Sequence, residues 1–64
     1  MIKIGDLLYD ADNKCFGVVS ERREGYPFPW IVTWNDGRIN WVDSSTVNVW
    51  KKELKDLISG SQSE

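Results

Sequence analysis

The sequence predicts a mainly β domain in which five short strands close into a small barrel, followed by one short C-terminal α-helix. Runs of β-branched and aromatic residues alternate with short polar turns, which is typical of antiparallel strands. The triplet Asn35-Asp36-Gly37 lies between two such runs and has the residue types that tolerate a positive φ in hairpin turns. From Trp50 onward the apolar residues take helical spacing. We expect a closed barrel because closure removes the sheet edges that so short a chain can hardly protect.

The first half of the chain contains the first two predicted strands. The mostly apolar run Asp6–Tyr9 is the first, and Asp10–Lys14 is a turn whose Asp and Asn side chains can bond to their own backbone. Cys15–Ser20 is the second strand, where Gly17 indicates a bulge, a bend or close backbone packing. The charged segment Glu21–Gly25 predicts the next turn.

The second half of the chain contains the other three predicted strands. Two prolines in Tyr26–Trp30 exclude a central strand there and favour an extended segment. The β-branched and aromatic run Trp30–Trp34 predicts the third strand, and Arg38–Val42 returns beside it as the fourth. Asp43–Thr46 predicts a turn, and Val47–Trp50 predicts a short fifth strand.

The C-terminal end of the chain has the spacing of an amphipathic helix. Trp50, Leu54, Leu57 and Ile58 fall at i, i+4, i+7 and i+8, which places them on one stripe. Gly60 is expected to end the helix. The predicted organisation is a barrel over residues 1–50, a helix packed on the barrel over residues 51–59, and a disordered tail over residues 60–64.

The composition of the 64-residue chain limits what can stabilise it. A domain of this size buries only about 60% of the surface that its unfolded chain exposes. The chain has one cysteine and no histidine, so neither an internal disulfide nor a zinc site is expected. Four Trp, two Tyr and two Phe are therefore the main core material, and self-association can supplement it.

Charge and targeting signals argue for a cytoplasmic protein. The sequence has no run of 18 apolar residues and no adequate signal-peptide core, so no membrane partner is expected. The single unpaired cysteine, Cys15, fits a reducing compartment. The formal net charge of −2 gives no general attraction to nucleic acid or to an anionic membrane.

Catalysis is not expected. Histidine is absent, and Ser44-Ser45 has no base nearby in the sequence. Asp6, Asp10 and Asp12 lack the glycine and the final glutamate of an EF-hand loop, and no glycine-rich phosphate loop occurs. The sequence therefore predicts no enzyme, no metal site and no cofactor.

Four short motifs resemble SH3-like β-barrels of the Tudor type. They are Gly5-Asp6-Leu7-Leu8, Gly17-Val18-Val19, the run IVTWNDG at 31–37, and Trp41-Val42. The resemblance covers Ile4 to Val49 and implies a five-stranded SH3-like barrel. Short chains of this design are also common among tailed-phage proteins, which adds a component of a phage assembly to the possible roles.

The resemblance implies a candidate ligand site at one mouth of the barrel. Many Tudor domains hold a methylated lysine or arginine there in an aromatic cage, through attraction of the cation to π faces. Tyr9 and Trp34 match two walls of such a cage, and Asp36 matches an acidic rim residue. The other two walls are missing, because Phe16 is one residue out of register and Asn40 stands where an aromatic residue is expected.

The aromatic residues outside the mouth divide between core and contact surface. Trp41 shares a strand face with Ile39, which predicts a core position. Trp34, next to the turn, fits cross-strand packing and ligand contact equally well. Phe16 and Val18 face away from their neighbours in the second strand, which favours an external partner, either a second copy or the C-terminal helix.

The predicted function is a non-catalytic module that binds a protein segment through the aromatic mouth or through an outer aromatic face. The first alternative is a small barrel that binds nucleic acid through arginines and exposed aromatic residues. The second alternative is a self-associating component of a larger assembly. The predicted mouth residues are Tyr9, Trp34, Asp36 and Asn40, the outer-face residues are Tyr26, Phe28 and Trp30, and the nucleic-acid candidates are Arg22, Arg23 and Arg38.

Overall fold

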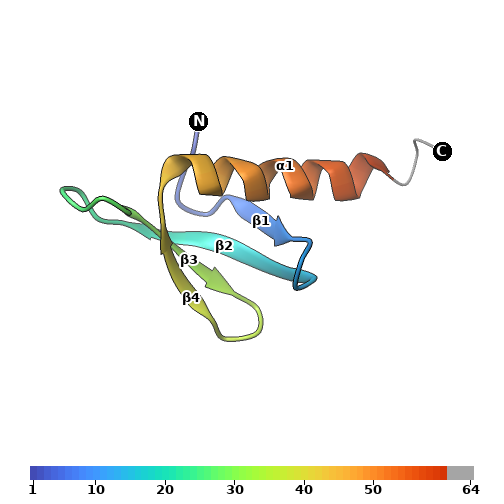
Figure 1. Cartoon of the computed structure of the whole chain (residues 1–64), viewed down its shortest axis with the longest axis horizontal. Coiled ribbons are helices and arrows are strands. Elements are labelled where there is room, and N and C mark those ends of the chain that lie inside the picture. Colours follow the sequence, from blue (N-terminus) through green and yellow to red (C-terminus); the bar gives the residue numbers. More distant parts are fainter. Residues whose placement is uncertain (61–64) are drawn as a thin grey trace.

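A computed structural model describes residues 1–60, which form one β-sheet and one helix (Figure 1). The predicted disordered tail over residues 60–64 falls outside the described residues except for Gly60, which is the last residue of the helix. The helix runs alongside the first strand, and the hairpin between the second and third strands projects away from it. The elements are β1 (Leu7–Asp10), β2 (Cys15–Arg22), β3 (Trp30–Trp34), β4 (Ile39–Val42) and α1 (Ser44–Gly60).

The sheet is an open antiparallel meander with the strand order β1-β2-β3-β4. The prediction of five strands closed into a barrel is therefore wrong for residues 1–60, where β1 and β4 form the two edges of the sheet. The mainly β class and the C-terminal helix are confirmed. Closure fails because the segment predicted as the fifth strand is helical, which leaves no strand to join β4 to β1.

The β3–β4 hairpin, which Asn35-Asp36-Gly37 signals most clearly in the sequence, is present. The next hairpin, β2–β3, is also present, but β2 continues to Arg22, two residues into the predicted turn Glu21–Gly25. The β3–β4 turn is closed by Trp34, whose backbone N–H donates to the Arg38 carbonyl at 2.9 Å. Gly37 has φ 94°, a left-handed conformation that explains glycine at this position. In the β2–β3 hairpin the register shifts between Val19 and Glu21, so a bulge lies in β2.

The helix α1 begins seven residues before the predicted start at residue 51 and takes the place of the predicted strand Val47–Trp50. Asp43 caps its N-terminus, because one carboxylate oxygen accepts the Thr46 backbone N–H at 3.1 Å and the Thr46 hydroxyl at 2.8 Å. The first helical bond follows, from the Val47 N–H to the Asp43 carbonyl at 3.2 Å. Capping by the Asp43-Ser44-Ser45-Thr46 segment thus favours a helix more strongly than the β-branched side chains of Val47 and Val49 favour a strand.

The core lies between α1 and one face of the sheet. Trp34 and Trp50 meet edge to face, with ring centroids 4.8 Å apart, and join the sheet to the helix. Lys51 of the helix also pairs with Asp6 at 3.0 Å. The buried cluster consists of Leu8, Val19, Trp30, Val32, Trp34 and Val47.

One predicted core residue lies elsewhere. Trp41 is 46% exposed and lies on the sheet face opposite α1, so its prediction as core is wrong. The alternation that pairs Trp41 with Ile39 was correct, but both side chains point away from the helix. In the described part of the chain, no helix has both the length and the apolar character needed to cross a membrane.

Candidate functional site

The two faces of the sheet differ because α1 packs on only one of them. Strand alternation places Leu8, Gly17 and Trp34 toward the helix. The residues that alternate with these along each strand point to the opposite side of the sheet, which no helix of residues 1–60 covers. We call this side the open face and define it by Leu7, Phe16, Val18, Thr33, Ile39 and Trp41.

The open face is mostly apolar across the width of the sheet, and its one polar side chain, Thr33, donates its hydroxyl to Ser20 at 3.0 Å. Leu7, Val18, Thr33 and Ile39 are register partners on β1, β2, β3 and β4, so they form one row. Leu7 is 63% exposed and Ile39 is 60% exposed, at the two ends of that row. Phe16 is 45% exposed beside it. One face of the sheet thus exposes several large apolar side chains to water, which soluble proteins rarely leave without a use.

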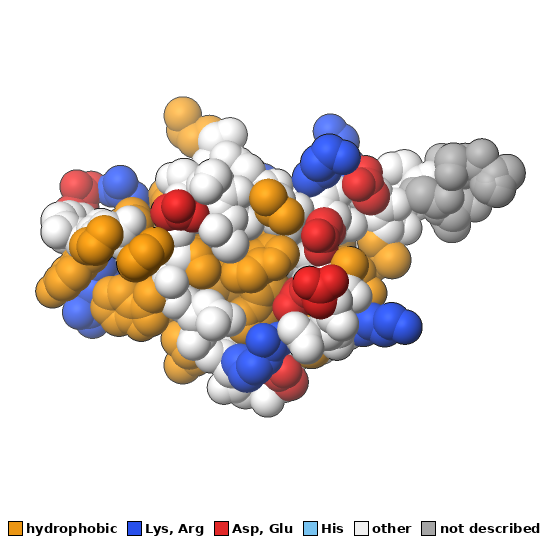
Figure 2. All heavy atoms as spheres, viewed as in Figure 1, with side chains coloured by type: hydrophobic (Ala, Val, Ile, Leu, Met, Phe, Trp, Pro, Cys, Tyr) orange, Lys and Arg blue, Asp and Glu red, His pale blue; other side chains and the backbone are white. Residues whose placement is uncertain are grey.

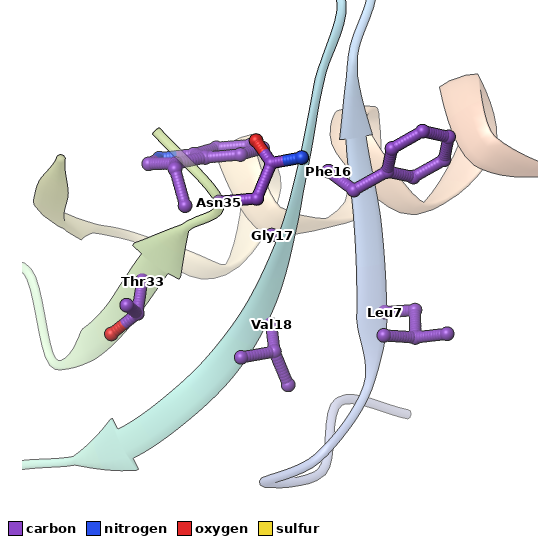
Figure 3. A pocket seen from close by; sticks show the side chains of 7 residues that line it. Leu7, Phe16, Gly17, Val18, Thr33 and Asn35 are labelled. Atoms are coloured by element: carbon purple, nitrogen blue, oxygen red, sulfur yellow. The ribbon is translucent and has the colours of Figure 1, made fainter. Parts of the chain in front are cut away.

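A shallow depression lies in the part of the open face over β1, β2 and β3 (Figure 3). Phe16, Gly17 and Val18 belong to β2, while Leu7 and Thr33 flank them on the neighbouring strands. Its volume of about 280 Å³ is at the lower limit for small-molecule pockets, which are about 300–1,000 Å³. The shape therefore suits a protein surface better than an enclosed small ligand.

An aromatic and cationic group extends the open face toward the β2–β3 hairpin. The Tyr26 and Trp41 rings meet edge to face with centroids 5.9 Å apart, and the Arg23 guanidinium lies 5.4 Å from the Trp41 ring centre. Arg23 also donates to Glu21 at 3.2 Å. Figure 2 shows hydrophobic side chains gathered on this projecting hairpin and again where the helix meets the sheet, with charges of both signs around them.

The predicted mouth residues come together only in part. Trp34 is 2% exposed, and its indole N–H donates to the Asn40 side-chain oxygen at 2.6 Å. The guanidinium carbon of Arg38 lies 5.5 Å from the centre of the Trp34 ring. The Nε of the same side chain donates to the Asp36 carboxylate at 2.7 Å. The cation that lies over Trp34 is thus the chain's own Arg38. Tyr9 lies apart from this group and packs against Phe16, with the two ring centroids 4.9 Å apart.

The charges in this group are mutually satisfied. The backbone N–H of Arg38, followed by its side chain, lowers the pKa of Asp36. The hydrogen bond from the Asn13 side-chain amide is the main cause of the lowered pKa of Asp10, and the charge of Arg38 lowers that pKa further. The hydrogen bond with Asp36 raises the pKa of Arg38. Cys15, whose thiol donates to Asp36 at 3.5 Å, borders the same group.

The outer-face candidates divide between the two sides of the sheet. Trp30 is buried on the helix side, where its indole N–H donates to the Ser44 hydroxyl at 3.0 Å. Tyr26 and Phe28 are both exposed on the β2–β3 hairpin. Of the three, Tyr26 contacts Trp41, a residue of the open face.

The three arginines predicted for nucleic-acid binding each have an acidic partner. Arg22 pairs with Glu24, Arg23 with Glu21, and Arg38 with Asp36. They also stack on three different tryptophans, so they form no common basic surface. Within residues 1–60, no group of three or more His, Cys, Asp or Glu side chains is arranged to hold a metal ion.

Sequence reasoning missed the ends of the open face, Leu7 and Ile39, and assigned Trp41 to the core. The alternation of Phe16 and Val18 was the available signal, because it predicted a second apolar face on β2. Alternation could not decide which face the helix covers. In comparisons with known proteins, no family model, no curated protein and no solved structure matches the chain.

Proposed function

We propose that the protein is a non-catalytic interaction module that binds another protein chain through its open face. The observation that carries the proposal is the row Leu7, Val18, Thr33 and Ile39, which crosses all four strands and has large exposed side chains at both ends. Burial of such a surface is the main source of free energy in protein association. An antiparallel sheet can keep one face in water, but that face is normally polar.

The residues at the edge of the open face fit this function. Trp, Tyr and Arg are the side chains most often found at the energetic centres of protein interfaces. One contacting group already contains Trp41, Tyr26 and Arg23, so these side chains lose little conformational entropy on binding. The open face replaces the aromatic mouth in this proposal, because Trp34 is buried and faces Arg38. It does not depend on the resemblance to the Tudor type, which stays a prediction from the sequence motifs.

Binding of nucleic acid is the weaker candidate. Phosphate contacts need lysine or arginine side chains whose charge is free to replace counterions. Arg22, Arg23 and Arg38 are each paired with a carboxylate, and the whole chain has a formal net charge of −2.

The proposal can be tested by a pair of matched lysine substitutions. Ile39→Lys places a charge in the open face, whereas Val49→Lys places one at a similarly exposed apolar position on α1. We expect the wild-type chain and Val49→Lys to capture the same protein from extracts of the native cell, and Ile39→Lys to capture at least about tenfold less. Circular dichroism establishes that both variants are folded. Equal capture by the two variants would contradict a role for the open face.

A further inference from the structure

We infer that the partner of the open face is a second copy of this chain, seated face to face, so that two sheets form the inner layers of a symmetric dimer and the helices its outer layers. The inference rests on the proposed function because it uses the same face. The helix does not obstruct this arrangement, because α1 packs on the Leu8 and Trp34 side of each sheet. Two sheets packed in this way lie about 10 Å apart, as in a β-sandwich.

The width of the open face argues for a sheet as its occupant. The row from Leu7 to Ile39 spans four strands, and adjacent strands lie about 4.8 Å apart. A single extended peptide is about as wide as one strand, so it would leave most of the row in water. A second four-stranded sheet matches the row in width and covers both of its ends.

The area of the open face is close to what a stable dimer needs. The exposed parts of Leu7, Phe16, Ile39, Trp41 and Tyr26 together amount to on the order of 600 Å². A standard interface buries about 800 Å² from each partner. The partly exposed Val18 and Thr33, which lie between the ends of the row, add roughly 100 Å² at most, so the total falls within the range of about 600–1,000 Å² per partner in standard interfaces. The open face therefore lies at the upper end of the range of about 300–600 Å² for the largest apolar patch on a typical monomer.

The charge distribution also suits a second copy. A two-fold axis brings identical surfaces together, so an unpaired charge near the axis would meet its own kind. The six residues that define the open face carry no charge, and Arg23 at its edge is paired with Glu21. Two copies can therefore approach without like-charge repulsion in the contact.

Self-association supplements a small core. Seven buried hydrophobic residues lie within residues 1–60, and six of them form the cluster between the helix and the sheet. A chain of this size is marginal when it buries one side of its sheet only. Pairing the open faces adds a second apolar layer without a second helix.

The first experiment measures association of the full chain by sedimentation equilibrium from 1 µM to 1 mM. We expect a monomer–dimer equilibrium for the wild type and for Val49→Lys, and at least about a hundredfold weaker association for Ile39→Lys. The melting temperature of the wild type should also rise with protein concentration, whereas that of Ile39→Lys should not. A dimer that survives Ile39→Lys unchanged would overturn the inference.

The second experiment tests the face-to-face arrangement directly. Thr33 lies within the row on the inner strand β3, so in a Cys15→Ser background a short bis-maleimide with a span of about 10 Å, the separation of face-packed sheets, should join Thr33→Cys between copies. Asn48→Cys, on an exposed position of α1, is the matched control and should form no covalent link between copies under the same conditions. Cross-linking of the control alone, or of neither variant in a sample that sediments as a dimer, would indicate another interface, such as pairing of the β4 edges.

The two proposals fail in different ways. A chain that stays monomeric at 1 mM overturns the second copy as the partner. The proposed function then survives only if that monomer captures a different protein in a manner sensitive to Ile39→Lys. If neither association nor capture responds to the substitution, both proposals fall.

Discussion

At the scale of single residues, the tryptophans divide by the direction in which each points from the sheet. Trp34 points to the helix and lies directly over Gly17, whose missing side chain makes room for the indole. A Cβ at Gly17 would come within 2.5 Å of the Trp34 ring. Trp41 points to the other side and stays exposed. Gly17 was singled out from the sequence for a bulge, a bend or close packing, and the close packing against Trp34 is the explanation.

The contact between Gly17 and Trp34 gives a prediction about stability. Gly17→Ala should lower the free energy of unfolding by about 1–3 kcal/mol, because the new methyl group overlaps the six-membered ring of the indole. Urea unfolding followed by tryptophan fluorescence measures this loss.

A double-mutant cycle identifies the cause. Trp34→Phe removes the ring atoms that the methyl group would meet, so Gly17→Ala should cost less in that background, with a coupling of roughly 0.5–3 kcal/mol. Additive costs would show that backbone strain, and not the contact with Trp34, explains the effect.

At the scale of elements, the segment after β4 decided the architecture. Val47 and Val49 favour a strand by their side chains, and the same segment also continues the helical stripe back from Trp50 to Val47. Asp43 resolves this conflict in favour of the helix, because its carboxylate satisfies the N–H and hydroxyl groups of Thr46. The capping residue was present in the sequence, but the hydrogen bonds that it makes depend on the turn geometry.

The cap makes the stability of α1 dependent on pH, with less stability in acid. Hydrogen bonds from the Thr46 hydroxyl and then its backbone N–H lower the pKa of Asp43 below its ordinary value near 3.8. The stabilisation is fully present above the unfolded value and is lost as the pH falls through the lower, folded value. Asp43→Ala should therefore lower the urea midpoint at pH 7, and the difference from the wild type should shrink at pH 2.5.

Asp43→Asn is the matched control for this prediction. The amide oxygen can still accept the Thr46 hydrogen bonds, but it does not titrate. We expect this variant to resemble the wild type at pH 7 and to lose less stability between pH 7 and pH 2.5. An equal acid loss in Asp43→Asn and the wild type would assign the pH dependence to other carboxylates, such as Asp6, Asp10 or Asp36.

At the scale of the whole molecule, a single layer of side chains holds the helix on the sheet. Trp50 is the largest helix residue in that layer and meets Trp34 edge to face. Trp50→Ala should lower the free energy of unfolding by about 3 kcal/mol, which is a large share of the stability of a small domain. Leu57→Ala, at an exposed position farther along α1, should cost much less. Equal losses in thermal or urea unfolding would contradict the assignment of Trp50 as the anchor.

Much of the local structure was predictable because it depends on neighbours in the chain. The strand Trp30–Trp34 and the Asn35-Asp36-Gly37 hairpin were predicted with their observed bounds or position, since side-chain alternation and positive φ are local properties. The surroundings of the predicted mouth residues could not be predicted from neighbours in the chain. Whether Trp34 meets a ligand or Arg38 depends on the packing of Trp50 from a distant part of the chain.

By itself, the sequence determined the mainly β class, four strand positions, the β3–β4 turn and the presence of a C-terminal helix. Only the tertiary structure decided that the sheet stays open and that the helix covers Leu8 and Trp34, leaving Leu7, Ile39 and Trp41 exposed. The physical reason is that a strand with apolar residues on both sides has two suitable faces. The choice between them depends on where a cap turns the chain after β4, which is a contact in space and not a pattern along the sequence.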